Sequence, residues 1–194
     1  MNRFIAVAAL FVVALGMFAT TNASAAVITY TTFMDGPSEP NASLGTGNAT
    51  VTYDDSLHTM RVQASFSGLT GDSTAAHIHA ATAAPFTGTA GVATRTPTFA
   101  GLPTGVKAGS WDETYDLTLN TSWNPSYITA NGGTPATAET AFFNAMNANK
   151  AYFQIHSSAF PGGEIRGFMV PEPGALTLLG VVGLGAAIRR RRAG

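Results

Sequence analysis

Short segments in which apolar and polar residues alternate with a period of two constrain the fold of this chain most. Within residues 57–69, Met60, Val62, Ala64 and Phe66 fall on one face of an extended strand. Comparable segments, bounded by Gly, Pro or Asp, span residues 27–34, 49–53, 113–119, 151–156 and 164–170. Many short strands joined by such turns are typical of β-sandwiches and barrels. We therefore predict an all-β fold with antiparallel strands.

One helix is predicted within this β pattern, over residues about 134–149. Thr134 suits the cap position and Pro135 the first helical position. Small and apolar residues follow at helical spacing: Ala138, Ala141, Phe142, Ala145 and Met146. We expect this helix to pack on the sheet as a crossover and to carry no site.

The N-terminus is typical of a secretory signal peptide over residues 1–25. Arg3 precedes an apolar run over residues 4–18, and Ala23 and Ala25 form a small-x-small cleavage site. The exported chain would then begin at Ala26. Because the chain contains no cysteine, its hydrophobic core must stabilise it without disulfides, and thiolate metal sites are excluded.

The C-terminus has three consecutive parts: Pro171-Glu172-Pro173, an apolar run over residues 174–188, and arginines 189–192. As a helix, this run is shorter than the hydrocarbon core of a bilayer, which is about 30 Å thick. The arginines favour the cytoplasmic side. We predict a stop-transfer segment that anchors the chain transiently in the inner membrane; a permanent single-helix anchor is the alternative.

This order of motif, apolar run and arginines over residues 170–192 closely resembles the PEP-CTERM sorting signal. The resemblance implies processing near Pro171, Glu172 and Pro173 by an exosortase-type membrane protease. It also implies delivery to the outer surface or extracellular matrix of a Gram-negative bacterium. The chain would then consist of a signal peptide (1–25), one domain (26–170) and a sorting signal (171–194).

Three of the four histidines have a spacing that suits a metal site. His77 and His79 flank Ile78 and share one face of a strand. His156 lies in a second strand; if the two strands are close together, three imidazoles converge. Such a set suits copper, zinc or nickel better than calcium or magnesium. The alternative is that the imidazoles only make hydrogen bonds, and His58 is expected to face solvent.

Glu164 and Arg166 are two residues apart, have opposite charges and share a strand face. They form either an exposed ion pair or a partly buried pair that orients His156, since metal-bound histidines usually have such a partner. We keep both as candidate residues around the metal site.

Charge and motifs exclude several classes of protein. The net charge is −1, with 10 Lys and Arg against 11 Asp and Glu, so a strongly basic nucleic-acid-binding protein is excluded. The chain lacks the Gly-x-Ser-x-Gly, His-Glu-x-x-His and P-loop motifs, and we do not expect an enzyme. A hydrolase would need a carboxylate pair drawn from Glu113, Asp116 and Glu164.

Four blocks, at residues 67–70, 77–79, 151–157 and 160–167, resemble the CHRD domain. The resemblance runs from about residue 29 to 169. It implies an antiparallel β-sandwich of immunoglobulin-like or superoxide-dismutase-like character, although the further histidines of a copper–zinc dismutase are missing. We expect a structural or binding module with exopolysaccharide or an envelope protein as partner. The alternative is a copper- or zinc-binding protein of the cell envelope.

Overall fold

The computed structural model describes residues 27–172. The predicted signal peptide with Ala23 and Ala25, and the predicted apolar helix and arginines of the tail, lie outside these residues. Within residues 27–172, no helix is long and apolar enough to cross a membrane.

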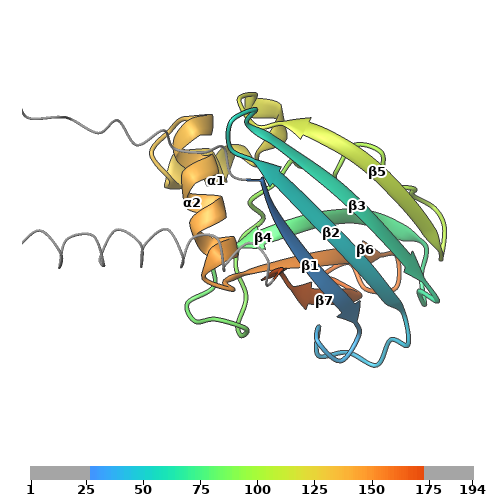
Figure 1. Ribbon diagram of the computed structural model, residues 1–194. Helices are drawn as coiled ribbons and strands as arrows, with labels where there is room; N and C mark the ends of the chain where they lie inside the picture. Colours follow the sequence, from blue (N-terminus) through green and yellow to red (C-terminus); the bar gives the residue numbers. More distant parts are fainter. Residues whose placement is uncertain (1–26, 173–194) are drawn as a thin grey trace, which may run out of the picture.

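One antiparallel sheet of eight strands forms most of the molecule (Figure 1). Neighbouring strands follow the order β4-β6-β7-β1-β2-β3-β5, and β8 pairs with β1. The strands are β1 (Val27–Asp35), β2 (Thr46–Asp54), β3 (Thr59–Ser67), β4 (Ser73–Ala80), β5 (Gly109–Asp116), β6 (Ala151–Ser157), β7 (Ile165–Phe168) and β8 (Val170–Pro171). The predicted all-β antiparallel fold is confirmed.

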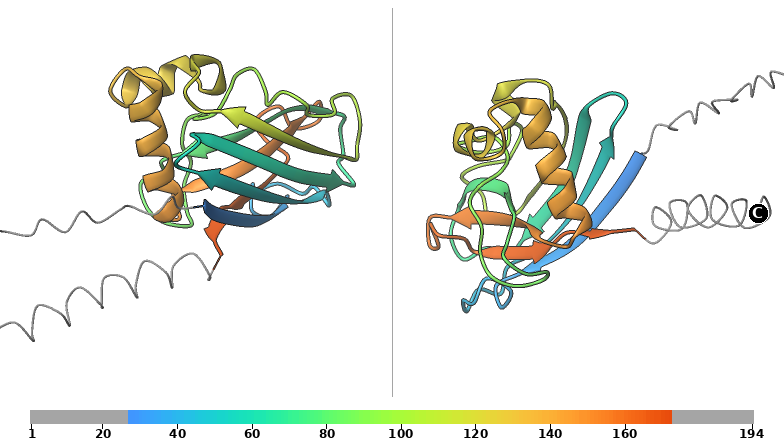
Figure 2. Two further views of the ribbon diagram at one scale, coloured as in Figure 1. Left: turned by 45° about the horizontal axis from the view of Figure 1, so that its top comes forward. Right: turned by 90° about the vertical axis from the view of Figure 1, so that its left-hand side faces the viewer.

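The sheet curls into a half-barrel, so that β4 and β6 pass behind β2 and β3 (Figures 1 and 2). Side chains from the two ends of the sheet meet across the core. The ring of Trp111 on β5 lies 6.1 Å from that of Phe153 on β6, and Phe99 lies 5.7 Å from Phe153. The core is therefore enclosed between two halves of one continuous sheet.

The alternation predicted for β3 is present: Met60, Val62, Ala64 and Phe66 are all buried in this core. The strand predicted over residues 113–119 has different bounds. It begins at Gly109 and ends at Asp116, whose carboxylate accepts hydrogen bonds from both the amide and the hydroxyl of Thr118. This turn ends the strand and leaves Leu119 exposed.

Two α-helices lie at one end of the sheet (Figure 2). Helix α2 (Pro135–Asn147) agrees with the predicted helix; Thr134 caps it by accepting from the Thr137 amide at 3.2 Å. Helix α1 (Pro125–Ala130) was not predicted, although Asn124 before Pro125 has the same cap-then-proline pattern. A short 3₁₀ helix (Asn120–Ser122) precedes it.

Candidate metal centre

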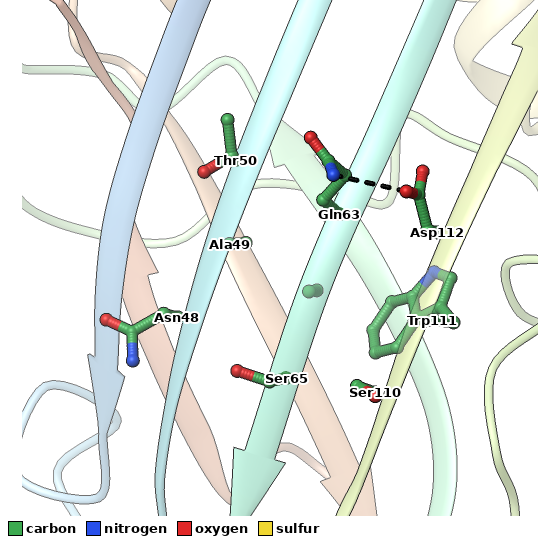
Figure 3. A pocket seen from close by; sticks show the side chains of 9 residues that line it. Asn48, Ala49, Thr50, Gln63, Ser65, Ser110, Trp111 and Asp112 are labelled. Atoms are coloured by element: carbon green, nitrogen blue, oxygen red, sulfur yellow. Dashed lines mark hydrogen bonds between the residues drawn. The ribbon is translucent and has the colours of Figure 1, made fainter.

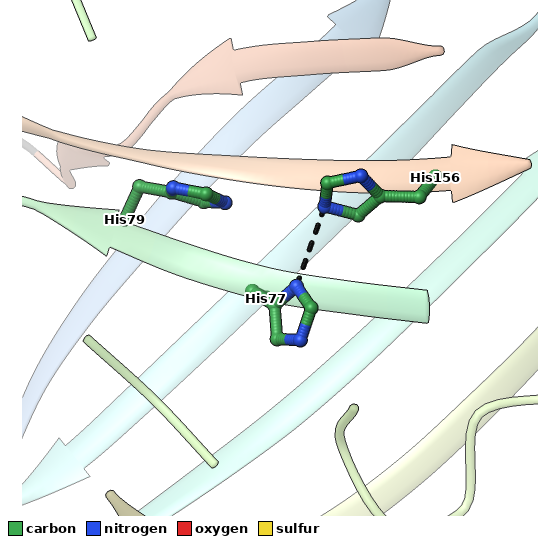
Figure 4. Close-up of side chains that lie close together, drawn as sticks. All are labelled: His77, His79 and His156. Atoms are coloured by element: carbon green, nitrogen blue, oxygen red, sulfur yellow. Dashed lines mark hydrogen bonds between the residues drawn. The ribbon is translucent and has the colours of Figure 1, made fainter. Parts of the chain in front are cut away.

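The three histidines lie on the face of the sheet opposite the core. Ile78 on β4 and Ile155 on β6 are completely buried in the core, so the histidines next to them in sequence point the other way. The pairing of β4 with β6 brings His77 and His79 beside His156, as Figure 4 shows. The convergence expected of the three residues is therefore present.

One nitrogen of each imidazole lies within 4.8 Å of the corresponding nitrogens of the other two. The closest approach, 3.3 Å, joins Nδ1 of His77 to Nε2 of His156. The ring centroids are 5.3 Å apart for this pair, 6.0 Å for His77 and His79, and 6.1 Å for His79 and His156. This spacing places three potential ligand atoms around one point.

The other nitrogen of each imidazole meets a main-chain carbonyl. Nε2 of His77 lies 2.7 Å from the carbonyl oxygen of Pro97, and Nδ1 of His79 lies 2.9 Å from that of Ala90. Nδ1 of His156 lies 2.9 Å from the carbonyl oxygen of Pro161. A carbonyl only accepts, so these three nitrogens carry the protons. The converging nitrogens then keep their lone pairs.

The converging nitrogens lack hydrogen-bond donors. Nε2 of His79 is buried and has no hydrogen-bond partner, and the 3.3 Å contact between His77 and His156 joins two acceptors. Burial lowers the pKa of His77 and His156, and it lowers the pKa of His79 to about 4. Near neutral pH, protons therefore do not satisfy the three nitrogens.

Aromatic and charged groups support the cluster on one side. The ring of Tyr152 stacks on that of His79, with centroids 4.7 Å apart and planes inclined by 9°. The guanidinium of Arg166 lies over the ring of Tyr152, 5.0 Å from its centroid, and it pairs with Glu39 at 3.2 Å. Arg166 thus lies beside the ring that stacks on His79, and its positive charge contributes to lowering the pKa of His79.

A family model described as a CHRD domain matches residues 20–169. The chain belongs to the CHRD domain family. A second model, the PEP-CTERM protein-sorting motif, matches residues 170–192. No curated protein and no solved structure matches the chain.

The sorting motif indicates export of the CHRD domain to the surface or exterior of a Gram-negative bacterium. It also implies recognition by exosortase, a membrane processing enzyme. Of the motif residues, Pro171 and Glu172 are described by the structure, whereas Pro173 lies outside the described range.

The position of Glu164 in the CHRD domain corrects one expectation. Its buried carboxylate accepts hydrogen bonds from the Ser43 hydroxyl at 2.6 Å and from the amides of Thr70 and Gly71. These donors hold it against the loops that precede β2 and β4, whereas the Pro161 carbonyl orients His156. Glu164 and Arg166 have separate partners and form no ion pair with each other.

His58 lies apart from the metal centre, in the turn between β2 and β3. Its half-exposed side chain places Nδ1 3.0 Å from the buried carboxylate of Glu139 on α2, which also accepts from the Tyr53 hydroxyl at 2.8 Å. The predicted solvent-facing position is confirmed, and the exposed ring also contacts Glu139. His58 is useful as a control residue, because it is a histidine with no part in the cluster.

The three carboxylates considered for hydrolysis have different surroundings. Glu164 is buried near Ser43, and Asp116 is engaged by Thr118 at the end of β5. Glu113 is exposed on β5. The sequence did not reveal the main-chain partners of the three histidines, which are the carbonyls of Ala90, Pro97 and Pro161. Every residue carries a carbonyl, so no residue type indicates such a partner.

Proposed function

We propose that this exported CHRD domain binds one copper or zinc ion through His77, His79 and His156. One observation supports the proposal above others: three imidazole nitrogens converge, and each ring has its proton held outward by a main-chain carbonyl. Hydrogen bonds of this kind fix the tautomer and orientation of histidines that ligate metals. The buried, unpartnered Nε2 of His79 would gain a partner in the ion.

The chemistry of the ligands favours copper over zinc. Imidazole suits both ions, and divalent copper binds more tightly than zinc at comparable nitrogen sites. The chain has no cysteine to supply thiolate, and the converging set contains no carboxylate. Calcium and magnesium, which require oxygen ligands, do not fit this set.

Isothermal titration calorimetry of the purified exported protein with copper(II), and separately with zinc(II), tests the proposal. We expect one equivalent to bind, and His77→Ala and His156→Ala each to lower the affinity at least tenfold. His58→Ala is the matched control, because it removes a histidine outside the cluster. Absence of stoichiometric binding in the wild type, or equal loss in the control, would reject the metal site.

We also propose that the domain acts as a binding module for exopolysaccharide or an envelope protein. A polar face on β2, β3 and β5 supports this second function (Figure 3). A shallow hollow there, of about 570 Å³, is lined by Ala49, Ala64 and Trp111 and by six polar residues: Asn48, Thr50, Gln63, Ser65, Ser110 and Asp112. Arg61 and Gln63 both donate to Asp112, which fixes the polar groups at its rim.

Co-sedimentation with exopolysaccharide from the producing cells tests this second function. We expect the Asn48→Ala/Gln63→Ala double variant to bind at least fivefold more weakly than the wild type. His58→Ala, which lies outside the hollow, should bind like the wild type. Equal binding by all three proteins would remove the polar face from consideration.

A further inference from the structure

The sorting motif begins inside the folded domain. The motif model starts at residue 170, and Val170 and Pro171 form strand β8. In the antiparallel pairing with β1, Val170 lies opposite Thr31 and Pro171 lies opposite Tyr30. The pairing continues past the strand, because the amide of Glu172 donates to the carbonyl of Thr29 at 2.9 Å.

The proline of the motif is compatible with this pairing. Hydrogen-bonded and non-hydrogen-bonded pairs alternate along an antiparallel ladder. Since Glu172 and Thr29 are hydrogen-bonded, Pro171 and Tyr30 form a non-hydrogen-bonded pair. Pro171 therefore loses no ladder bond through its missing N–H. It is buried, whereas Val170 is exposed.

We propose that β8 is a strap that must leave β1 before the membrane processing enzyme can cut at the sorting motif. A peptide held by a protein in extended form uses its own backbone N–H and C=O groups. At Val170 and Glu172, β1 already engages those groups. The inference depends on processing by the exosortase-type enzyme and is independent of the metal site.

The pairing is short, so release is accessible to the folded protein. Strand β8 has two residues, and short terminal segments open with a small part of the free energy of global unfolding. Release of β8 exposes only the edge of β1 that faces β8, because the opposite edge of β1 stays paired with β2 along its whole length. The domain therefore stays folded while the motif becomes available.

A disulfide between β1 and β8 tests the strap. Thr31 and Val170 are directly opposite in the ladder, which is within the reach of a disulfide, and Val170 is exposed. The natural chain has no cysteine to compete, and an exported protein meets oxidising conditions. In the Thr31→Cys/Val170→Cys variant, we expect the oxidised chain to keep its C-terminal tail.

The matched control is a disulfide that leaves β8 free. Thr29 and Thr52 are opposite each other on β1 and β2, so Thr29→Cys/Thr52→Cys links two neighbouring strands of the same sheet. We expect this control, and each single variant at Thr31 and Val170, to be processed like the wild type. Reduction in the cells should restore processing of the Thr31→Cys/Val170→Cys variant.

Mass spectrometry of cell-envelope protein reports the tail, and thiol alkylation reports the disulfide in the same sample. The strap is supported if the cross-linked fraction keeps the tail at least tenfold more often than the open fraction. Equal processing of both fractions, failure of the cysteines to pair, or an equal block in the β1–β2 control would overturn it. A wild type that keeps its tail would instead show that processing itself is absent.

Discussion

Hydrogen bonds to the main chain determine the protonation of the three clustered histidines and of Glu164. Carbonyls of Ala90, Pro97 and Pro161 select one tautomer of each clustered imidazole. Main-chain amides and a serine hydroxyl similarly surround Glu164. Burial alone would raise the pKa of this carboxyl, but hydrogen bonds from Ser157, Ser43 and Thr70 outweigh it and lower the pKa.

Glu164→Gln should therefore destabilise the domain in a pH-dependent way. A carboxyl with a lowered pKa stabilises the folded state above its unfolded pKa of about 4.3, and this contribution is lost as the pH falls through its folded pKa. At pH 7, we expect the variant to lose about 2–3 kcal/mol in the free energy of unfolding. Below pH 4, the difference from the wild type should shrink.

Urea denaturation at pH 7 and at pH 3 measures this effect. Glu113→Gln is the control, since Glu113 is exposed, and it should change the stability little at either pH. Equal stability of the wild type and Glu164→Gln at pH 7 would contradict the stabilising role of the carboxylate.

Among the elements, β1 is the strand on which the two C-terminal strands converge. It pairs with β2 along its whole length, and its other edge is shared between β7 and β8. The approach of β7 is close at Gly167, where a Cβ would overlap the carbonyl oxygen of Phe33 and the hydroxyl of Thr32. Glycine is required there because the strands would otherwise separate.

We expect Gly167→Ala to lower the free energy of unfolding by about 3 kcal/mol, because the Phe33 carbonyl that a Cβ would overlap belongs to the backbone and cannot rotate away. Gly162→Ala is the matched control, since a Cβ at Gly162 meets no atom within 4 Å. Thermal and urea unfolding of the two variants provides the measurement. Similar stability of the two variants would show that β7 and β1 separate easily.

In the whole molecule, one continuous sheet separates the apolar core from the histidine cluster. Its inner face encloses the core, and the outer face of β4 and β6 carries the histidines. The long connection between β4 and β5 supplies two of the three carbonyls, from Ala90 and Pro97. An ion bound here would therefore join β4, β6 and this connection.

Metal binding should raise the thermal stability of the whole domain. A ligand at a hundredfold excess over its Kd stabilises the folded state by about 2.7 kcal/mol. For a domain of this size, that corresponds to an increase in Tm of about 5–10 °C. Calorimetry with copper(II), and again after a chelator, measures the increase and its reversal. His58→Ala should show the same increase, and its persistence in His156→Ala would contradict the site.

The features that the sequence predicted correctly are local. Alternating burial along β3 and the cap at Thr134 each depend on residues a few positions apart. The shared face of His77 and His79 follows from the same period of two. The missed helix α1 is short, and the end of β5 depends on a turn at Asp116 that competes with the alternation.

The sequence by itself determined the strand faces, the sorting segment, and the types of residue available for a metal. Only the tertiary structure decided that β4 pairs with β6, so that His156 joins His77 and His79. It also decided which carbonyls accept hydrogen bonds from the three imidazoles. The burial of Glu164 and the pairing of Pro171 with β1 likewise follow from the tertiary structure. These features depend on contacts between distant segments and on main-chain groups, and main-chain groups are the same in nearly every residue.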